Sequence, residues 1–194
     1  MEILSKLFGS ETKVKIMRLF LSNPERVFNI KDIVDRTKSD SPKVRREVAV
    51  LEKMKLFKRR VYLKKKSNSH GFILNSQFSY LGQLNNFLIN LEPLQPKEII
   101  KRISKLGNIK LIIVAGVFIQ EHESRLDILI VGDNMKKGMV EKTIKILESE
   151  IGRELRYAYF TTEDFKYRLS MFDKLIRDVL DYPHKKVLNR LPIL

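Results

Sequence analysis

Residues 40–63 read DSPKVRREVAVLEKMKLFKRRVYL, and this stretch decides how the amino-terminal part of the chain folds. Ser41 and Pro42 predict the start of a helix, because a serine side chain can cap free backbone N–H groups and proline suits the first helical position. The helix is expected to end near Lys55. Apolar residues at intervals of four and three form one stripe on it, which predicts a buried face: Val44, Val48 and Leu51.

The opposite side of this predicted helix is basic, and so is the segment that follows it. Residues 56–63 have the character of a strand, residues 64–71 form a polar turn, and residues 72–74 complete a hairpin. The cations of the helix lie off the apolar stripe: Lys43, Arg45, Arg46 and Lys53. Those of the hairpin are Lys58, Arg59, Arg60, Lys64, Lys65 and Lys66.

Two further helices are expected before this stretch. Residues 11–22 have a broad apolar face and end before Asn23-Pro24, and Asn29 can cap a second helix. Three helices followed by a basic hairpin is the order of elements in a winged helix-turn-helix.

The positive charge is concentrated in the same region. The chain has a net charge of +15, and residues 43–66 contain 11 basic and 2 acidic side chains. Such a concentration is the footprint of a polyanion contact. We therefore expect the helix, from Ser41 onward, to enter the major groove of double-stranded DNA, and Arg59 and Arg60 of the hairpin to contact the DNA as well. The lysines at the hairpin tip are expected to reach phosphates or the minor groove. The alternatives are a merely solvated face, or an acidic protein or RNA as the partner.

Composition excludes several other classes of protein. The chain has no cysteine, which rules out disulfides and thiol chemistry. No apolar run approaches the length of a membrane span, and no signal peptide is apparent, so a cytoplasmic protein that contacts no membrane is expected. Neither a cofactor nor a metal is expected, because the three histidines lack metal-binding spacing: His70, His122 and His184.

The rest of the chain predicts a second domain of another class. We expect domain boundaries at residues 1–76 for the basic domain, 77–96 for a connecting helix and linker, and 97–194 for a small α/β domain. In this last domain, the expected strands are residues 110–119, 126–131 and 154–160, and the expected helices are residues 97–105, 137–151, 161–171 and 173–180.

The order of several short motifs resembles a known prokaryotic family. Its members carry a winged-helix domain followed by a nucleotidyltransferase-like domain of the polymerase-beta superfamily. The resemblance implies an α+β fold with a short mixed sheet in the second domain. The motifs that carry it are LFGS at 7–10, LSNPER at 21–26, SPKVRRE at 41–47, AG at 115–116, DILIVGD at 127–133, IGREL at 151–155 and FTTEDF at 160–165.

The catalytic positions that the resemblance implies are largely replaced. Active members carry a glycine-serine pair, two aspartates one residue apart, and a third carboxylate, which together hold magnesium. Here Gly116 is followed by Val117, Arg125 and Asp127 stand at the two aspartate positions, and Arg156 stands near the third. The domain is therefore interpreted as a pseudoenzyme with no catalytic residue.

Two interpretations of the altered site stay open. In the first, Arg125, Asp127 and Arg156 form structural ion pairs or point to solvent. In the second, Gly116 and these three residues form a pocket for a nucleotide or another anionic effector without metal.

Together these features predict a transcriptional regulator. It would bind DNA through the winged helix as a homodimer, and the second domain would serve dimerisation, ligand binding or partner binding. The alternatives are a divergent nucleotidyltransferase of the toxin–antitoxin type and a winged-helix module that binds protein or RNA.

Overall fold

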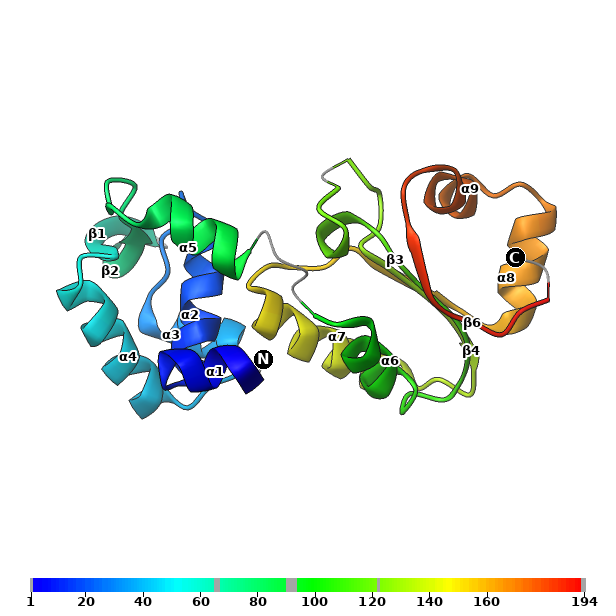
Figure 1. Cartoon of the computed structure of the whole chain (residues 1–194), viewed down its shortest axis with the longest axis horizontal. Coiled ribbons are helices and arrows are strands. Elements are labelled where there is room, and N and C mark those ends of the chain that lie inside the picture. Colours follow the sequence, from blue (N-terminus) through cyan, green and yellow to red (C-terminus); the bar gives the residue numbers. More distant parts are fainter. Residues whose placement is uncertain (1, 65–66, 90–93, 122, 193–194) are drawn as a thin grey trace. The chain divides into compact units, whose positions relative to one another are not determined.

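The computed structural model describes residues 2–64, 67–89, 94–121 and 123–192 (Figure 1). The chain has a mixed α+β fold with small sheets. It divides into two compact units, Met1–Pro93 with Ile146–Arg153, and Leu94–Lys145 with Glu154–Leu194. Within the described ranges, no helix has both the length and the apolar character needed to cross a membrane.

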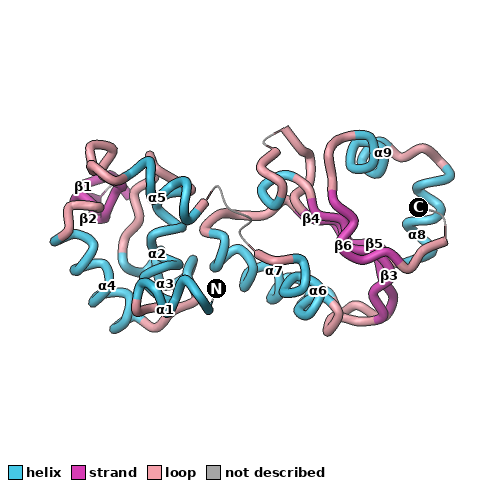
Figure 2. Tube along the Cα trace, viewed as in Figure 1, coloured by secondary structure: helices cyan, strands magenta, loops and turns pink. Residues whose placement is uncertain are grey.

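Unit 1 is a group of helices with one hairpin, as Figure 2 shows. The predicted order of three helices and a hairpin is confirmed, while the helix at the amino terminus was not predicted. The elements are α1 (Glu2–Phe8), α2 (Glu11–Leu21), α3 (Ile30–Thr37), α4 (Ser41–Lys53), β1 (Phe57–Lys64), β2 (Ser67–Leu74) and α5 (Leu81–Leu88).

The start of α4 differs from the prediction. Asp40 is the capping residue, its side chain makes no capping hydrogen bond, and Ser41 already lies inside the helix. Pro42 stands in the first turn, as expected. The predicted serine cap is wrong because the helix begins one residue earlier. By contrast, Asn29 caps α3 as predicted, in a capping box with Asp32.

The hairpin is longer than the prediction. β2 starts at Ser67 and pairs with β1 in antiparallel register from Lys64↔Ser67 to Phe57↔Leu74. The expected turn over residues 64–71 is therefore mostly strand, and Lys65 and Lys66 lie outside the described residues. The polar residues of β2 indicate exposure to solvent. An exposed strand has this property as well as a turn, so the pattern could not distinguish the two.

Aromatic rings form the centre of unit 1. Phe20 stacks on Phe57 with 4.0 Å between ring centroids, and meets Phe28 edge-on at 5.3 Å. Phe28 also exchanges two backbone hydrogen bonds with Phe72, which attaches the hairpin to the segment before α3. Gly71 allows this close approach, because a Cβ there would lie 2.9 Å from the Phe28 carbonyl oxygen.

Unit 2 contains a four-stranded sheet with the order β5-β4-β3-β6, in which only β4 and β5 are parallel. The predicted strands and helices are present, and β6 is an additional edge strand. The elements are α6 (Pro96–Ile103), β3 (Asn108–Val114), the 3-10 turn η1 (Gly116–Phe118), β4 (Ile128–Asp133), α7 (Lys137–Ile151), β5 (Tyr157–Phe160), α8 (Thr162–Ser170), α9 (Lys174–Asp181) and β6 (Lys185–Asn189).

Both faces of the two central strands, β3 and β4, are buried. Leu111 and Leu129 pack with Phe165 of α8 and Ile176 of α9 in one core cluster. The other face is covered by α6 and by the part of α7 that belongs to this unit (Figure 1). Burial on both faces explains why β3 and β4 are almost continuously apolar. The first predicted strand extended to Ile119, whereas the chain turns at Gly116 into η1.

Asp133 connects the end of β4 to the start of α8. The backbone N–H of Thr162 donates to one carboxylate oxygen at 3.0 Å, and the Thr162 hydroxyl donates to the other at 2.8 Å. These hydrogen bonds lower the pKa of Asp133 below its ordinary value. The charged form therefore stabilises the fold above the pKa of the unfolded chain, and this contribution is lost as the pH falls through the folded pKa.

We expect Asp133→Asn to lower the free energy of unfolding by about 1 kcal/mol at pH 7, because an amide replaces a hydrogen-bonded carboxylate. The difference from the wild type should shrink as the pH falls below about 4, where the carboxylate of the unfolded chain is protonated. Urea denaturation at several pH values measures both effects. The exposed Asp35→Asn serves as a control with little expected change. An equal loss for Asp133→Asn at every pH would contradict this account.

Candidate nucleic-acid interface

The rotation of α4 divides its side chains into a buried and an exposed set. Val44, Val48 and Leu51 are at most 1% exposed, which confirms the predicted apolar stripe. The cations predicted to face outward are all exposed: Lys43, Arg45, Arg46 and Lys53. The helix therefore presents a basic face on the side away from the core.

Two of these cations have acidic neighbours. Lys43 forms an ion pair with Asp40 at 2.9 Å, and both side chains are well exposed. Arg46 reaches Glu47 at 3.4 Å, while Glu47 itself is buried and also pairs with Lys13 of α2 at 3.5 Å. Glu47 thus offsets the positive charge of Lys13 on the inner side of α4. The Arg46 side chain, which also reaches Glu47, stays exposed at the surface.

Other exposed cations of α4 and β1 have no acidic partner among the described residues. Among the side chains that the structure describes, Arg45, Lys53 and Arg60 make no ion pair and no hydrogen bond. All three are exposed. Of these, arginine is the better suited to base recognition, because its planar fork of N–H donors matches two acceptors at once.

Arg59 is held by α4 instead of being free. Its Nε and Nη2 donate to the two carboxylate oxygens of Glu52, and the second of these hydrogen bonds is 3.2 Å long. This contact raises the pKa of Arg59. The pair joins strand β1 to the last turns of α4, so it fixes the base of the hairpin relative to the helix. Arg59 was expected to contact DNA, and no local pattern in the sequence pointed to its pairing with Glu52.

The structure describes only some of the remaining hairpin cations. The ammonium group of Lys58 donates to the Gln77 side-chain oxygen at 3.4 Å and is exposed. Lys64 is the last residue of β1, and Lys65 and Lys66 lie outside the described residues.

The arrangement suits a polyanion more than a small ligand. Cations of α4 and β1 are spread along a convex helix and the strand beside it. The exposed side of an α-helix fits the major groove of B-DNA, where base edges offer donors and acceptors. Lysine and arginine beside the helix can contact phosphates.

The second site predicted from the sequence is organised around Asp127. This residue is fully buried. Its carboxylate accepts hydrogen bonds from the backbone N–H of Val117 at 3.0 Å and of Arg156 at 2.8 Å, and the Arg156 side chain pairs with it at 3.4 Å. Gly116 has a φ of +52°, and a Cβ there would clash with a carboxylate oxygen of Asp127. Asp127 therefore holds the turn after β3 against the start of β5.

Arg125 makes a different contact. Its Nε forms an ion pair with Asp178 of α9 at 2.7 Å. The two arginines expected to share one pocket are thus each paired with their own carboxylate, an arrangement in line with structural ion pairs. Among the described residues, no group of three or more potential metal ligands comes together.

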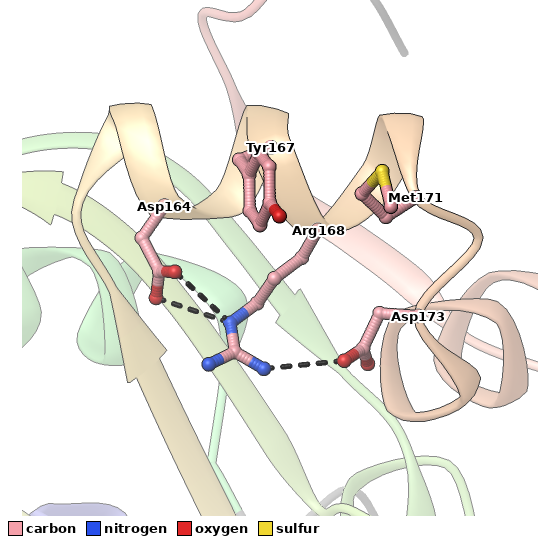
Figure 3. Close-up of a pocket in the computed structure, with 5 residues that line it drawn as sticks. All are labelled: Asp164, Tyr167, Arg168, Met171 and Asp173. Atoms are coloured by element: carbon pink, nitrogen blue, oxygen red, sulfur yellow. Dashed lines mark hydrogen bonds and ion pairs between the residues drawn. The ribbon is translucent and has the colours of Figure 1, made fainter.

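A third charged cluster lies at the corner between α8 and α9 (Figure 3). Arg168 contacts Asp164 at 3.1 Å and Asp173 at 3.1 Å, and its guanidinium lies 4.9 Å from the centroid of the Phe160 ring. These carboxylates raise the pKa of Arg168. Two acids around one arginine leave no excess positive charge for an anion, so this shallow hollow is a weaker candidate than the α4 face.

We expect Asp127→Ala to lower the free energy of unfolding by about 3 kcal/mol, because it removes a fully buried carboxylate and leaves the backbone N–H groups of Val117 and Arg156 without this acceptor. Urea denaturation followed by circular dichroism measures this loss. Asp181→Ala, at an exposed position on α9, is the control and should change stability by less than about 0.5 kcal/mol. Equal stability of Asp127→Ala and the wild type would show that Asp127 does not hold this turn.

Comparisons with protein-family models, with curated protein sequences and with solved structures give no match. The family resemblance drawn from the sequence motifs therefore stays a prediction. What the protein does is inferred from its charge distribution and from the geometry of α4 and β1.

Proposed function

We propose that this chain is a transcriptional regulator that binds double-stranded DNA through unit 1, acting as a winged helix-turn-helix. In this proposal, α4 is the recognition helix and the β1–β2 hairpin is the wing. The observation that carries the proposal is the outward face of α4, where Arg45 and Lys53 are exposed with no acidic partner among the described residues while the acid Glu47 is buried.

Charge placement favours DNA over a merely solvated surface. Exposed helix faces that serve solubility usually mix acids with bases, and each cation then tends to find a partner at i+3 or i+4. On α4, most cations point outward and the acids lie beneath the helix or at its edge. Double-stranded RNA fits less well, because its major groove is too narrow to admit this helix.

We further propose that unit 2 is a nucleotidyltransferase-like domain without catalytic activity, which serves dimerisation or binds a ligand or partner. The role of Asp127 supports this proposal. Its oxygens accept backbone N–H groups and face Arg156, so the carboxylate is engaged in holding the chain. A homodimer would place two recognition helices on two half-sites, which is how such readers gain affinity.

The test is selection of bound fragments from random and genomic DNA at two salt concentrations. A shared sequence motif is expected, with affinity that falls steeply as salt rises. Uniform binding with no motif would indicate an architectural role. No binding to duplex DNA at low salt would refute the proposal.

Arg45→Ala and Arg46→Ala are expected to relax sequence preference. Loss of a bidentate contact to guanine should reduce affinity for the selected sequence by about 5- to 100-fold and affinity for random DNA far less. Fluorescence anisotropy with both DNAs measures this ratio. Arg177→Ala on α9 is the matched control and should leave it unchanged. Unchanged preference in both α4 variants would show that α4 is not the recognition helix.

Glu52→Gln is expected to strengthen DNA binding. The change removes a negative charge beside the basic face and releases Arg59 for a phosphate. The slope of log affinity against log salt should become steeper by about 0.9. Titrations at several salt concentrations measure this slope. Glu163→Gln, an exposed acid on α8, changes the net charge equally and should leave the slope as it is. If both variants behave alike, the effect is one of net charge alone.

A further inference from the structure

Two exposed apolar residues interrupt the basic face of α4. Ala49 is exposed, and Val50 has 40% of its surface exposed. Ala49 follows Arg45 by four positions and Arg46 by three, so it lies one turn further along the same face. Val50 follows Arg46 by four positions and precedes Lys53 by three. Both apolar side chains therefore have cations one turn away, Arg46 before them and Lys53 after them, and Glu52 also stands three positions after Ala49.

Exposed apolar residues are unfavourable on a helix face that serves solubility alone. An exposed valine leaves methyl groups in water, and its β-branched side chain loses rotamer freedom in a helix. The buried stripe does not need it, because Val44, Val48 and Leu51 already fill that side. A small alanine next to it lets the helix backbone approach another surface closely. The two residues are suited to an apolar contact with whatever the arginines bind.

The major groove offers one apolar group on its floor, which is the 5-methyl of thymine. Alanine and other small apolar side chains contact it when the helix lies in the groove. One helical turn spans 5.4 Å, which corresponds to one to two base-pair steps. A methyl contact from Ala49 or Val50 would thus fall next to the base that Arg45 or Arg46 contacts.

We propose that Ala49 and Val50 read thymine methyl groups, so that each half-site contains a thymine within two base pairs of the guanine bound by Arg45 or Arg46. This inference rests on the proposed DNA-binding function and adds the base that the apolar part of α4 selects. The cations supply attraction and the guanine contact, while the two apolar residues discriminate thymine from cytosine and from uracil.

The experiment replaces each thymine of the selected sequence, one at a time, by deoxyuridine, which removes only the methyl group. We expect one or two positions, within two base pairs of the guanine, to lose about fourfold in affinity of the full chain. At those positions Val50→Ala or Ala49→Gly should bring the ratio of thymine to deoxyuridine affinity close to one. Leu7→Ala, which removes an exposed leucine on α1, should leave this ratio unchanged.

The outcomes separate this inference from the function on which it rests. A selected motif with no effect of deoxyuridine at any position overturns the methyl contact and leaves DNA recognition by α4 standing. The methyl contact is likewise overturned if the deoxyuridine effect persists in both α4 variants. If the chain selects no sequence from duplex DNA, sequence recognition itself fails and the methyl contact fails with it.

Discussion

Burial of the apolar stripe of α4 is the constraint on which the rest of unit 1 depends. Val44, Val48 and Leu51 are almost fully buried in the core that also contains the stacked rings of Phe20 and Phe57. A helix anchored along one stripe cannot rotate, so its other residues must face solvent. Arg45 points outward because the opposite side of α4 is packed in the core. Among the described residues, no hydrogen bond or ion pair holds its side chain there.

The same packing separates the acidic side chains of α4 from its basic ones. Glu47 lies on the inner side of α4, where Lys13 of α2 meets it, and Glu52 is joined to Arg59 on the hairpin. The acids of the helix are therefore used to attach α4 to its neighbours. The cations that attach α4 to no neighbouring element remain at the surface, where their electrostatic potentials add together. An exposed basic face is the consequence of holding the helix in place with its acids.

In unit 2, a buried carboxylate is likewise used to attach one element to another. A buried charge is tolerated when hydrogen bonds and an opposite charge satisfy it. Asp127 meets this requirement through two backbone N–H groups and the side chain of Arg156. The arrangement links the turn after β3 to β5, two segments separated by β4 and α7 in the sequence. Asp127 therefore holds together two parts of the chain that are far apart in sequence.

Local sequence determined most of the elements, because periodicity and caps act within a few residues. The buried stripe of α4, the cap at Asn29, the hairpin and the basic face were all predictable in this way. Strand β6 was not, because its sequence KKVLN has little apolar character and an edge strand on a buried sheet needs only one partner. The turn predicted over residues 64–71 was also misplaced, because polar residues indicate exposure to solvent and do not mark where a strand begins or ends.

Only the tertiary structure decided which charges meet. Glu52 and Arg59 are seven residues apart across a helix end and a strand, and Arg125 meets Asp178 from another element entirely. No periodic pattern encodes such pairs, because they depend on how elements pack against one another. The sequence by itself therefore determined where the positive charge lies along the chain. The tertiary structure determined which of those cations are already paired and which, like Arg45 and Arg60, face solvent unpaired among the described residues.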